Sequence, residues 1–178
     1  MKNRSFDLIV YGATSFVGQI LTRYLFEHIG VGGKVNWAIA GRSEKKLSVL
    51  KSSLGSNADS LSVIVADASD EVALTTMCQS ARVIVSTVGP YALYGEPLVK
   101  ACAENGTDYC DLCGEAYWIK AMILKYSEAA KASGARIVSC CGFDSIPSDL
   151  GVHFLQRQGK QRFGKYFDNI KLAVNTMK

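Results

Sequence analysis

Two glycines six residues apart, in the stretch GATSFVG (residues 12–18), mark the point where an apolar run gives way to an amphipathic pattern. Gly12 allows a tight turn at the end of a strand, and Gly18 allows a helix to pack closely against that strand. Free backbone N–H groups and the positive end of the helix dipole then converge on one point, a favourable site for pyrophosphate. Ser15 replaces the middle glycine of the usual G-x-x-G-x-x-G pattern, and its hydroxyl can also donate to phosphate.

The residues after the second apolar run indicate which dinucleotide is bound. An NAD site is expected to carry Asp or Glu there, bonding the ribose 2′-hydroxyl. This chain instead reads Ala40-Gly41-Arg42-Ser43. Arg42 offers a guanidinium fork to a 2′-phosphate and Ser43 a hydroxyl, so the sequence predicts NADP(H). The alternative, a solvated Arg42 at a helix start, is disfavoured because a cation there opposes the helix dipole.

Two later segments complete the predicted cofactor site. Asp67 follows the third apolar run, where it either meets the adenine edge or begins a helix. The fourth run is followed by Val88, Gly89 and Pro90, where the nicotinamide half of the cofactor should lie. Small residues at this point let the backbone approach the cofactor.

Candidate substrate-facing side chains follow the later apolar runs. They are Asp111, Glu115, Asp144 and Ser145. All would lie at the carboxyl edge of a parallel sheet, where substrates bind in this architecture, yet each also suits a cap or a turn. Tyr91 and Tyr94 either cover the nicotinamide ring or pack under a neighbouring domain, and packing is the interpretation we favour. These residues alone assign no catalytic group.

The six cysteines are predicted to be reduced thiols, with no metal bound. Cys110 and Cys113 form a C-x-x-C pair, and Cys140 and Cys141 are adjacent. A structural zinc site usually needs a second well-placed pair or histidines, and both histidines of this chain fall inside helical patterns. A thioredoxin-like redox pair is the alternative, disfavoured because the C-x-x-C ends a strand and does not open a helix.

Six short apolar runs alternate with helical patterns and would position these residues. The runs cover residues 7–11, 35–40, 61–66, 82–87, 107–112 and 136–140. Most are apolar on both faces, which is typical of strands buried inside a parallel sheet. Strand followed by helix, six times over, predicts an α/β fold with a doubly wound parallel sheet, the Rossmann architecture.

Amphipathic patterns and capping residues predict the helices. The first helix should bury an apolar stripe made of Val17, Ile20, Leu21, Tyr24 and Leu25. Ser43 is the expected N-cap of the second helix. Gly106 is the expected stop of a helix over residues 96–105, and Gly134 is the expected stop of a longer helix that carries Trp118 and Tyr126.

We expect residues 1–158 to form the nucleotide-binding domain and residues 159–178 to form a linker and the first strand of a second α+β domain. The Gly-containing stretch RQGKQRFGKYF (157–167) is linker-like, and DNIKLAVNTMK (168–178) alternates like a new strand.

Composition limits the classes of function. The chain has 178 residues, of which 48% are hydrophobic, and a net charge of +4 from scattered basic residues. No basic block suggests nucleic-acid binding, and no run approaches the ~20 apolar residues of a membrane span. The apolar run at the N-terminus is too short for a signal peptide. We therefore expect a cytoplasmic protein with a small-molecule substrate, no nucleic-acid partner and no transmembrane segment.

Four stretches together resemble the saccharopine dehydrogenase-like oxidoreductase family, in a branch that is also similar to trans-acting enoyl reductases of lipid assembly. The stretches are GATSFVGQ, WAIAGRSEKKL, VGPYALYGEPLVKACAENGTDYCDLCGE and GFDSIPSDLG. The resemblance implies an NADP-binding Rossmann domain followed by a larger substrate or dimerisation domain, a homo-oligomer at full length, and room for peripheral lipid association. It carries cofactor-binding roles to Gly12, Thr14, Ser15, Phe16, Val17 and Arg42, and it carries no catalytic residue.

Three functions compete. The first is an NADP-dependent oxidoreductase with a lipid-linked or amino-acid-derived substrate, in which this chain carries the cofactor domain and is inactive alone. The second is an NADP-binding sensor or scaffold without turnover. The third is a sugar epimerase with bound NAD, disfavoured by Arg42 and by the absence of Tyr-x-x-x-Lys after the fourth apolar run. No sequence feature separates the first two.

Overall fold

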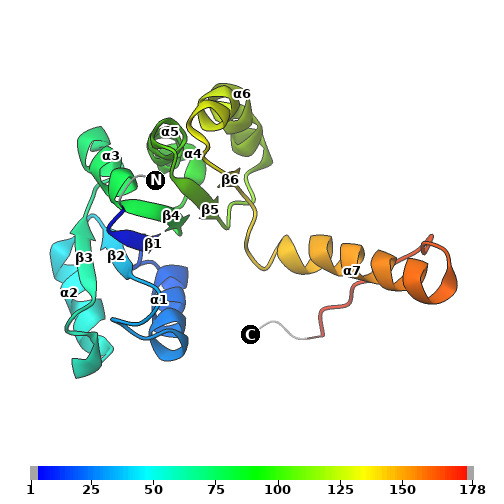
Figure 1. Ribbon diagram of the computed structural model, residues 1–178, viewed down its shortest axis with the longest axis horizontal. Helices are drawn as coiled ribbons and strands as arrows, with labels where there is room; N and C mark the ends of the chain where they lie inside the picture. The colour runs from blue at the N-terminus through cyan, green and yellow to red at the C-terminus, as the bar shows by residue number, and fades with distance from the viewer. Residues whose placement is uncertain (1–3, 176–178) are drawn as a thin grey trace.

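A six-stranded, all-parallel sheet organises the computed structural model, which describes residues 4–175 (Figure 1). The strands lie in the order β3 (Ser62–Val65), β2 (Trp37–Gly41), β1 (Phe6–Tyr11), β4 (Ala81–Ser86), β5 (Asp108–Asp111) and β6 (Ile137–Val138). The chain order reverses between β1 and β4, the switch point at which ligands bind in such sheets. The predicted α/β fold and all six predicted strands are confirmed.

Helices cover both faces of the sheet (Figure 1). One face carries α1 (Phe16–His28) and α2 (Glu44–Ser53). The other carries α3 (Glu71–Ser80), α5 (Glu96–Asn105) and α6 (Ala116–Ser133), with the short α4 (Tyr91–Tyr94) before α5. A 3₁₀ turn (Ser56–Ala58) precedes β3, and α7 (Ile146–Phe163) follows β6.

The core forms two layers because successive strand residues point to opposite faces. Ile9 and Tyr11 of β1 belong to a buried cluster with the helices α3, α5 and α6. Val10 lies between them in the chain and belongs to the other cluster, with Leu25 of α1 and Leu47 of α2. This double burial explains why the central strands read as continuous apolar runs.

The apolar stripe predicted for α1 is largely wrong. Three of its members are exposed, namely Val17, Ile20 and Tyr24. The helix packs through Gly18 and Thr22, together with the stripe members Leu21 and Leu25. A Cβ atom on Gly18 would lie 2.2 Å from the Gly12 carbonyl oxygen, so α1 sits too close to the preceding turn for any side chain there. This close approach determines which side of the helix faces the sheet.

The predicted helix ends are confirmed. The Ser43 hydroxyl oxygen accepts a hydrogen bond from the Lys46 N–H at 3.4 Å and caps α2. Gly106 and Gly134 end α5 and α6 in the left-handed conformation, with φ of 68° and 83°. Glycine adopts this conformation without the strain that a side chain introduces.

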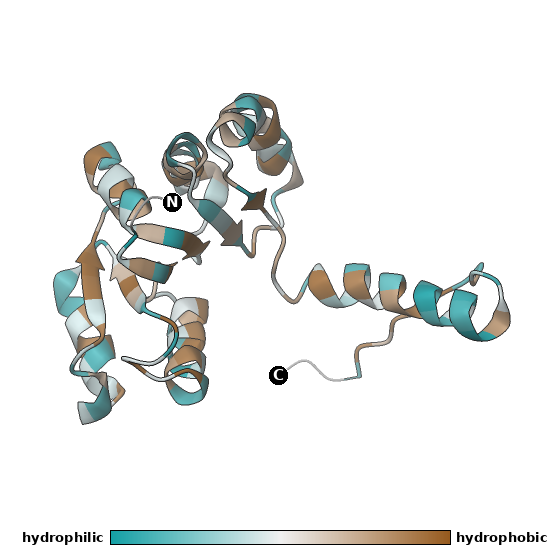
Figure 2. Ribbon diagram, in the orientation of Figure 1, coloured by the Kyte–Doolittle hydropathy of each residue, from teal (hydrophilic) through white to brown (hydrophobic). Residues whose placement is uncertain are grey.

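The last helix, α7, extends beyond the predicted boundary at residue 158 and stands away from the sheet (Figure 1). Its first half carries hydrophobic residues that no other element covers (Figure 2). Gly159 was expected to lie in a linker, but it continues the helix and makes room for the Phe167 ring, which would lie 2.9 Å from a Cβ there. Residues 168–175 form no strand within the described part of the chain. The second domain remains a prediction.

Candidate cofactor site

A cavity of about 330 Å³ lies at the carboxyl ends of β1, β2, β3 and β4, at the switch point of the sheet. It is lined by eight of the predicted cofactor residues: Gly12, Thr14, Ser15, Arg42, Ser43, Asp67, Val88 and Gly89. Four predicted residues do not line it: Phe16, Val17, Gly18 and Pro90. Turns that are far apart in the sequence therefore meet around one space.

Gly12 forms the tightest part of the cavity wall. Its φ is +82°, and a Cβ atom there would lie 2.6 Å from Val88 Cγ2 and 2.9 Å from Thr87 Oγ1. The turn after β1 thus lies directly against the end of β4, and only glycine fits at the contact.

The first turn of α1 presents unpaired backbone donors. Gly18 N donates to Ser15 Oγ at 3.0 Å and so is capped. Across the described chain, neither Phe16 N nor Val17 N has a hydrogen-bond acceptor, as is usual for the first N–H groups of a helix. Neither residue lines the cavity, but these two N–H groups stand at the positive end of the helix dipole.

Ser15 and Thr87 link the glycine turn to the end of β4. Their hydroxyl oxygens lie 3.0 Å apart, and Thr87 Oγ1 also lies 2.9 Å from the Gly12 carbonyl oxygen, to which it donates. The Ser15 hydroxyl hydrogen is then directed at Thr87, so in this arrangement Ser15 serves as a helix cap. Sequence reasoning missed Thr87. The only feature of the sequence that points to this residue is its hydroxyl group at the end of an apolar run.

Charged side chains gather at the end of the cavity that lies next to β2 and β3. Arg42 is exposed directly after β2, and Asp67 follows β3. Asp67 accepts hydrogen bonds from Ser69 N at 2.9 Å and Ser69 Oγ at 2.7 Å, which hold the pKa of its carboxyl below the usual value, aided by the charge of Arg42. Lys46 also lines the cavity, and sequence reasoning missed it. The feature of the sequence that could have indicated Lys46 is its position three residues after the N-cap Ser43.

Asp111 is buried and fully engaged at the end of β5. Its carboxylate accepts hydrogen bonds from Tyr109 Oη at 2.8 Å and from the N–H groups of Cys113 and Cys140, each at 3.0 Å. It therefore joins the loop after β5 to the loop after β6. Both carboxylate oxygens of Asp111 therefore accept hydrogen bonds from within the fold.

Glu115 and Tyr91 also have structural roles. The Glu115 carboxylate accepts hydrogen bonds from Tyr91 N at 2.7 Å and Ala92 N at 2.9 Å, at the start of α4. The buried Tyr91 hydroxyl donates to the Ser86 carbonyl oxygen at 3.1 Å, and burial raises the pKa of this phenol. The centroid of the Tyr91 ring lies 5.5 Å from that of the Trp118 ring. Tyr91 therefore packs within this domain and not under a neighbouring one, whereas Tyr94 lines the cavity and is 44% exposed.

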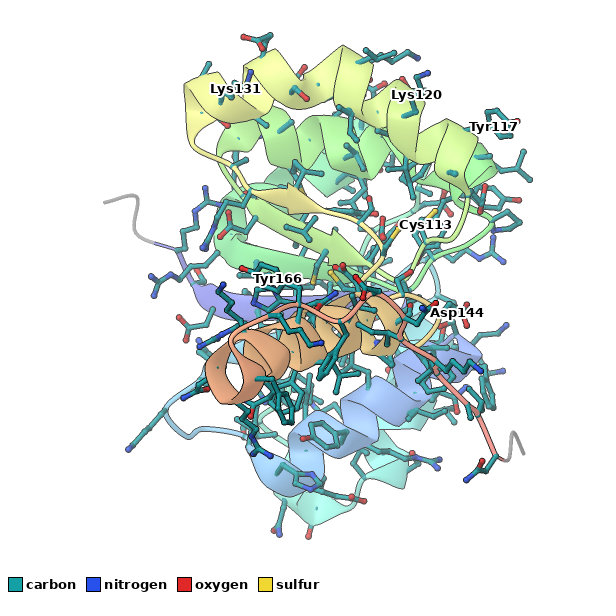
Figure 3. The ribbon with its side chains drawn as sticks, turned by 90° about the vertical axis from the view of Figure 1, so that its right-hand side faces the viewer. Cys113, Tyr117, Lys120, Lys131, Asp144 and Tyr166 are labelled. Carbon is teal, nitrogen blue, oxygen red and sulfur yellow. The ribbon has the colours of Figure 1, made fainter. Side chains whose placement is uncertain are left out.

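Figure 3 shows Cys113 near the end of β5 and Asp144 near the start of α7. Asp144 is exposed, and Ser145 is half-buried beside it. Neither side chain lines the cofactor cavity.

The cysteines of the described chain are all free thiols. Burial raises the pKa of Cys110 and of Cys113 to about 11. Within residues 4–175, no three His, Cys, Asp or Glu side chains are grouped so that they could hold a metal ion. In the same range, no helix is long and apolar enough to cross a membrane.

Comparison with known sequences identifies close relatives. Residues 8–138 match the profile of the family described as "Saccharopine dehydrogenase NADP binding domain". The chain is 47% identical over 156 residues to a "Lipid droplet localized protein" of Caenorhabditis elegans, covering 85% of this chain and 36% of that protein. It is 46% identical over 155 residues to a "Trans-acting enoyl reductase" of Mycobacterium tuberculosis, covering 87% of this chain and 36% of that protein. The chain thus spans little more than a third of these relatives.

Solved structures share the fold. Saccharopine dehydrogenase (L-Glu forming) of Saccharomyces cerevisiae superposes with a TM-score of 0.60 at 17% identity, over 86% of this chain and 32% of that one. The apo form of AtPrR2 superposes with a TM-score of 0.52 at 19% identity, over 75% of this chain and 48% of that one. The family match confirms the prediction of NADP as cofactor.

Proposed function

The chain belongs to the saccharopine dehydrogenase NADP-binding domain family, and from this premise we propose that it is the cofactor-binding part of an NADP-dependent oxidoreductase. One observation carries the proposal. The glycine turn, through Gly12, Thr14 and Ser15, and the turn at Arg42, which lies 30 residues after Gly12, line the same cavity at the switch point.

The residues around the cavity suit successive parts of NADP(H). The N–H groups of Phe16 and Val17 would bind the pyrophosphate, because Gly12 and Gly18 leave the backbone open to it. Arg42, Ser43 and Asp67 would hold the adenosine end. Val88, Gly89 and Pro90 would run beside the nicotinamide. When bound, NADPH supplies a hydride to an electron-poor carbon of the substrate.

The substrate class in this proposal is a lipid-linked or amino-acid-derived molecule. Two relatives support the lipid-linked class, since one is named as a trans-acting enoyl reductase and another as a lipid droplet localized protein. We place the protein in the cytoplasm, with access to a lipid surface, and as a homo-oligomer at full length.

A second candidate, an NADP-binding sensor or scaffold without turnover, is favoured by one feature of the carboxyl edge. The carboxylate oxygens of both Asp111 and Glu115 accept hydrogen bonds from other groups of the fold. Asp144 is the remaining predicted carboxylate there, and it is exposed. Steady NADPH oxidation by the full-length protein with enoyl thioesters, imines or 2-oxo acids would exclude the sensor.

Substitution of Arg42 tests the cofactor site. We expect Arg42→Ala to weaken NADPH binding by about 10- to 150-fold and to leave NADH binding unchanged, because a charge-assisted hydrogen bond contributes ~1.5–3 kcal/mol. Calorimetric titration of wild type and variant with both cofactors measures this. Equal losses for NADPH and NADH would mean that Arg42 does not contact the 2′-phosphate.

A further inference from the structure

A second cavity, of about 670 Å³, opens beside the cofactor cavity between α1 and α2. Thr14, Ser43 and Lys46 line both cavities, so the two spaces adjoin at these residues. Lys46 thus stands at the junction, on the first turn of α2. Neither the sequence patterns nor the family match gives it a role.

The junction is rich in unpaired positive charge. Arg42 lines the first cavity, and Arg23 and Lys45 line the second, which no acidic side chain lines. Within residues 4–175, none of these three cations forms an ion pair, and neither does Lys46. Cations without carboxylate partners attract an anion, and Arg42 and Lys46 are the two of these four that line the first cavity.

The one acid along the first cavity does not neutralise this charge by direct contact. Asp67 receives its short hydrogen bonds from Ser69 N and Ser69 Oγ. Its low pKa is explained chiefly by those bonds, and the charge of Arg42 contributes least. Arg42 therefore keeps its guanidinium donors for a ligand.

The start of α2 adds two more features that suit an anion. Ser43 Oγ accepts the Lys46 N–H at 3.4 Å, so the Ser43 hydroxyl hydrogen remains available to donate to a ligand. The N-cap residue and the residue three positions later lie on the same side of the first turn, which places the Lys46 side chain beside this hydroxyl. The helix dipole contributes further positive potential at the same end.

We infer that Lys46 is a second residue that recognises the 2′-phosphate of NADP(H), acting together with Arg42 and the Ser43 hydroxyl. This inference rests on the proposed cofactor site. A phosphate monoester carries a charge of about −1.5 to −2 at neutral pH, so one guanidinium leaves part of it unpaired and a second cation completes the neutralisation. NADH lacks this group, and Lys46 therefore contributes to the choice between the two cofactors.

Calorimetric titration of Lys46→Met with NADPH and NADH tests the inference. We expect NADPH binding to weaken about tenfold, which corresponds to ~1.4 kcal/mol, and NADH binding to change by less than about twofold. Lys45→Met is the matched control, because it removes the same charge from the next residue, which lines only the second cavity. It should change NADPH affinity by less than about twofold, and Lys46→Arg should retain most of the wild-type affinity.

Two results would overturn the inference: an equal loss for NADPH and NADH in Lys46→Met, or an equal NADPH-specific loss in Lys45→Met, which would indicate general electrostatic attraction. Unchanged NADPH binding in Lys46→Met would also overturn it and leave the proposed function intact. No NADPH binding by the wild type would refute the proposed function itself. Circular dichroism melting curves check that each variant is folded.

Discussion

At Gly12, both the backbone conformation and the surroundings exclude a side chain. Its φ is positive, and the end of β4 occupies the space where a Cβ would lie. Gly55 offers a natural comparison, since its φ is +92° but no atom lies within 4 Å of a Cβ there. Comparing substitutions at Gly12 and Gly55 therefore distinguishes the effect of backbone strain, present at both, from that of steric collision, present only at Gly12.

We expect Gly12→Ala to lower the free energy of unfolding by ~1–3 kcal/mol through strain and collision, and to weaken NADPH binding at least tenfold because the turn must shift. Gly55→Ala should show a comparable or smaller loss of stability and unchanged binding. Urea denaturation and NADPH titration of both variants measure the two effects. Normal NADPH affinity in folded Gly12→Ala would place the pyrophosphate elsewhere.

Asp111 is the residue that most firmly connects the two loops at the carboxyl edge. We expect Asp111→Ala to lower the free energy of unfolding by ~3–5 kcal/mol, because it leaves the buried donors of Tyr109, Cys113 and Cys140 without an acceptor. The exposed Asp144→Ala is the control and should change stability by less than about 0.5 kcal/mol. A loss below about 1 kcal/mol in Asp111→Ala would show that water replaces the carboxylate.

The site residues divide into those that the sequence predicts and those that depend on topology. Gly12 and Arg42 could be predicted because their positions relative to a strand end imply their roles. Thr87 could not, because its contact with Gly12 requires β4 to lie beside β1, although β2 and β3 follow β1 in the chain. The sequence does not distinguish Lys46 from the other lysines of α2, and the structure does so because Lys46 lines both the cavity at the switch point and the cavity between α1 and α2.

At the scale of elements, the Asp108–Arg136 ion pair joins the starts of β5 and β6. The Arg136 side chain holds the pKa of Asp108 below its ordinary value of 3.8. A carboxylate with a lowered folded-state pKa stabilises the protein above its unfolded pKa, and this stability is lost as the pH falls through the folded value.

We therefore expect stability to fall with acidification below about pH 4, and to fall less steeply in Asp108→Asn than in the wild type. Thermal melts from about pH 5 to about pH 2.5 measure the slopes, with Asp144→Asn as the control variant. Identical slopes for wild type and Asp108→Asn would show that this pair does not determine the acid response.

Strands were easier to predict than helix faces for a physical reason. A strand buried on both sides is apolar throughout, so its pattern needs no choice of face. In α1, by contrast, the buried side is determined by Gly18 and Thr22, a glycine and a hydroxyl that bonds the Gly18 carbonyl at 2.7 Å. Hydropathy assigns neither residue to a core, and the exposed Val17, Ile20 and Tyr24 were chosen instead.

For the whole molecule, we expect this chain to bind NADPH and to oxidise none of it. Hydride transfer requires a substrate held against the nicotinamide in a site that excludes water. In our proposal the described residues provide only the cofactor side of such a site, and the chain spans 36% of each of two relatives. Assays of this chain beside a full-length protein, with any substrate that the latter accepts, test the expectation. Comparable turnover by this chain would place the complete active site within it.

Helix α7 projects from the edge of the sheet and is attached to it through the loop after β6. In this loop Cys141 N donates to the Asp111 carbonyl oxygen at 2.7 Å, and Gly142 lies against Leu112. A helix of 18 residues is about 27 Å long, so a rotation of ~10° at its base moves its far end by ~5 Å. Because Asp111 holds the loop at the base of α7, a small shift at Asp111 would become a displacement of several ångströms at the far end of this helix.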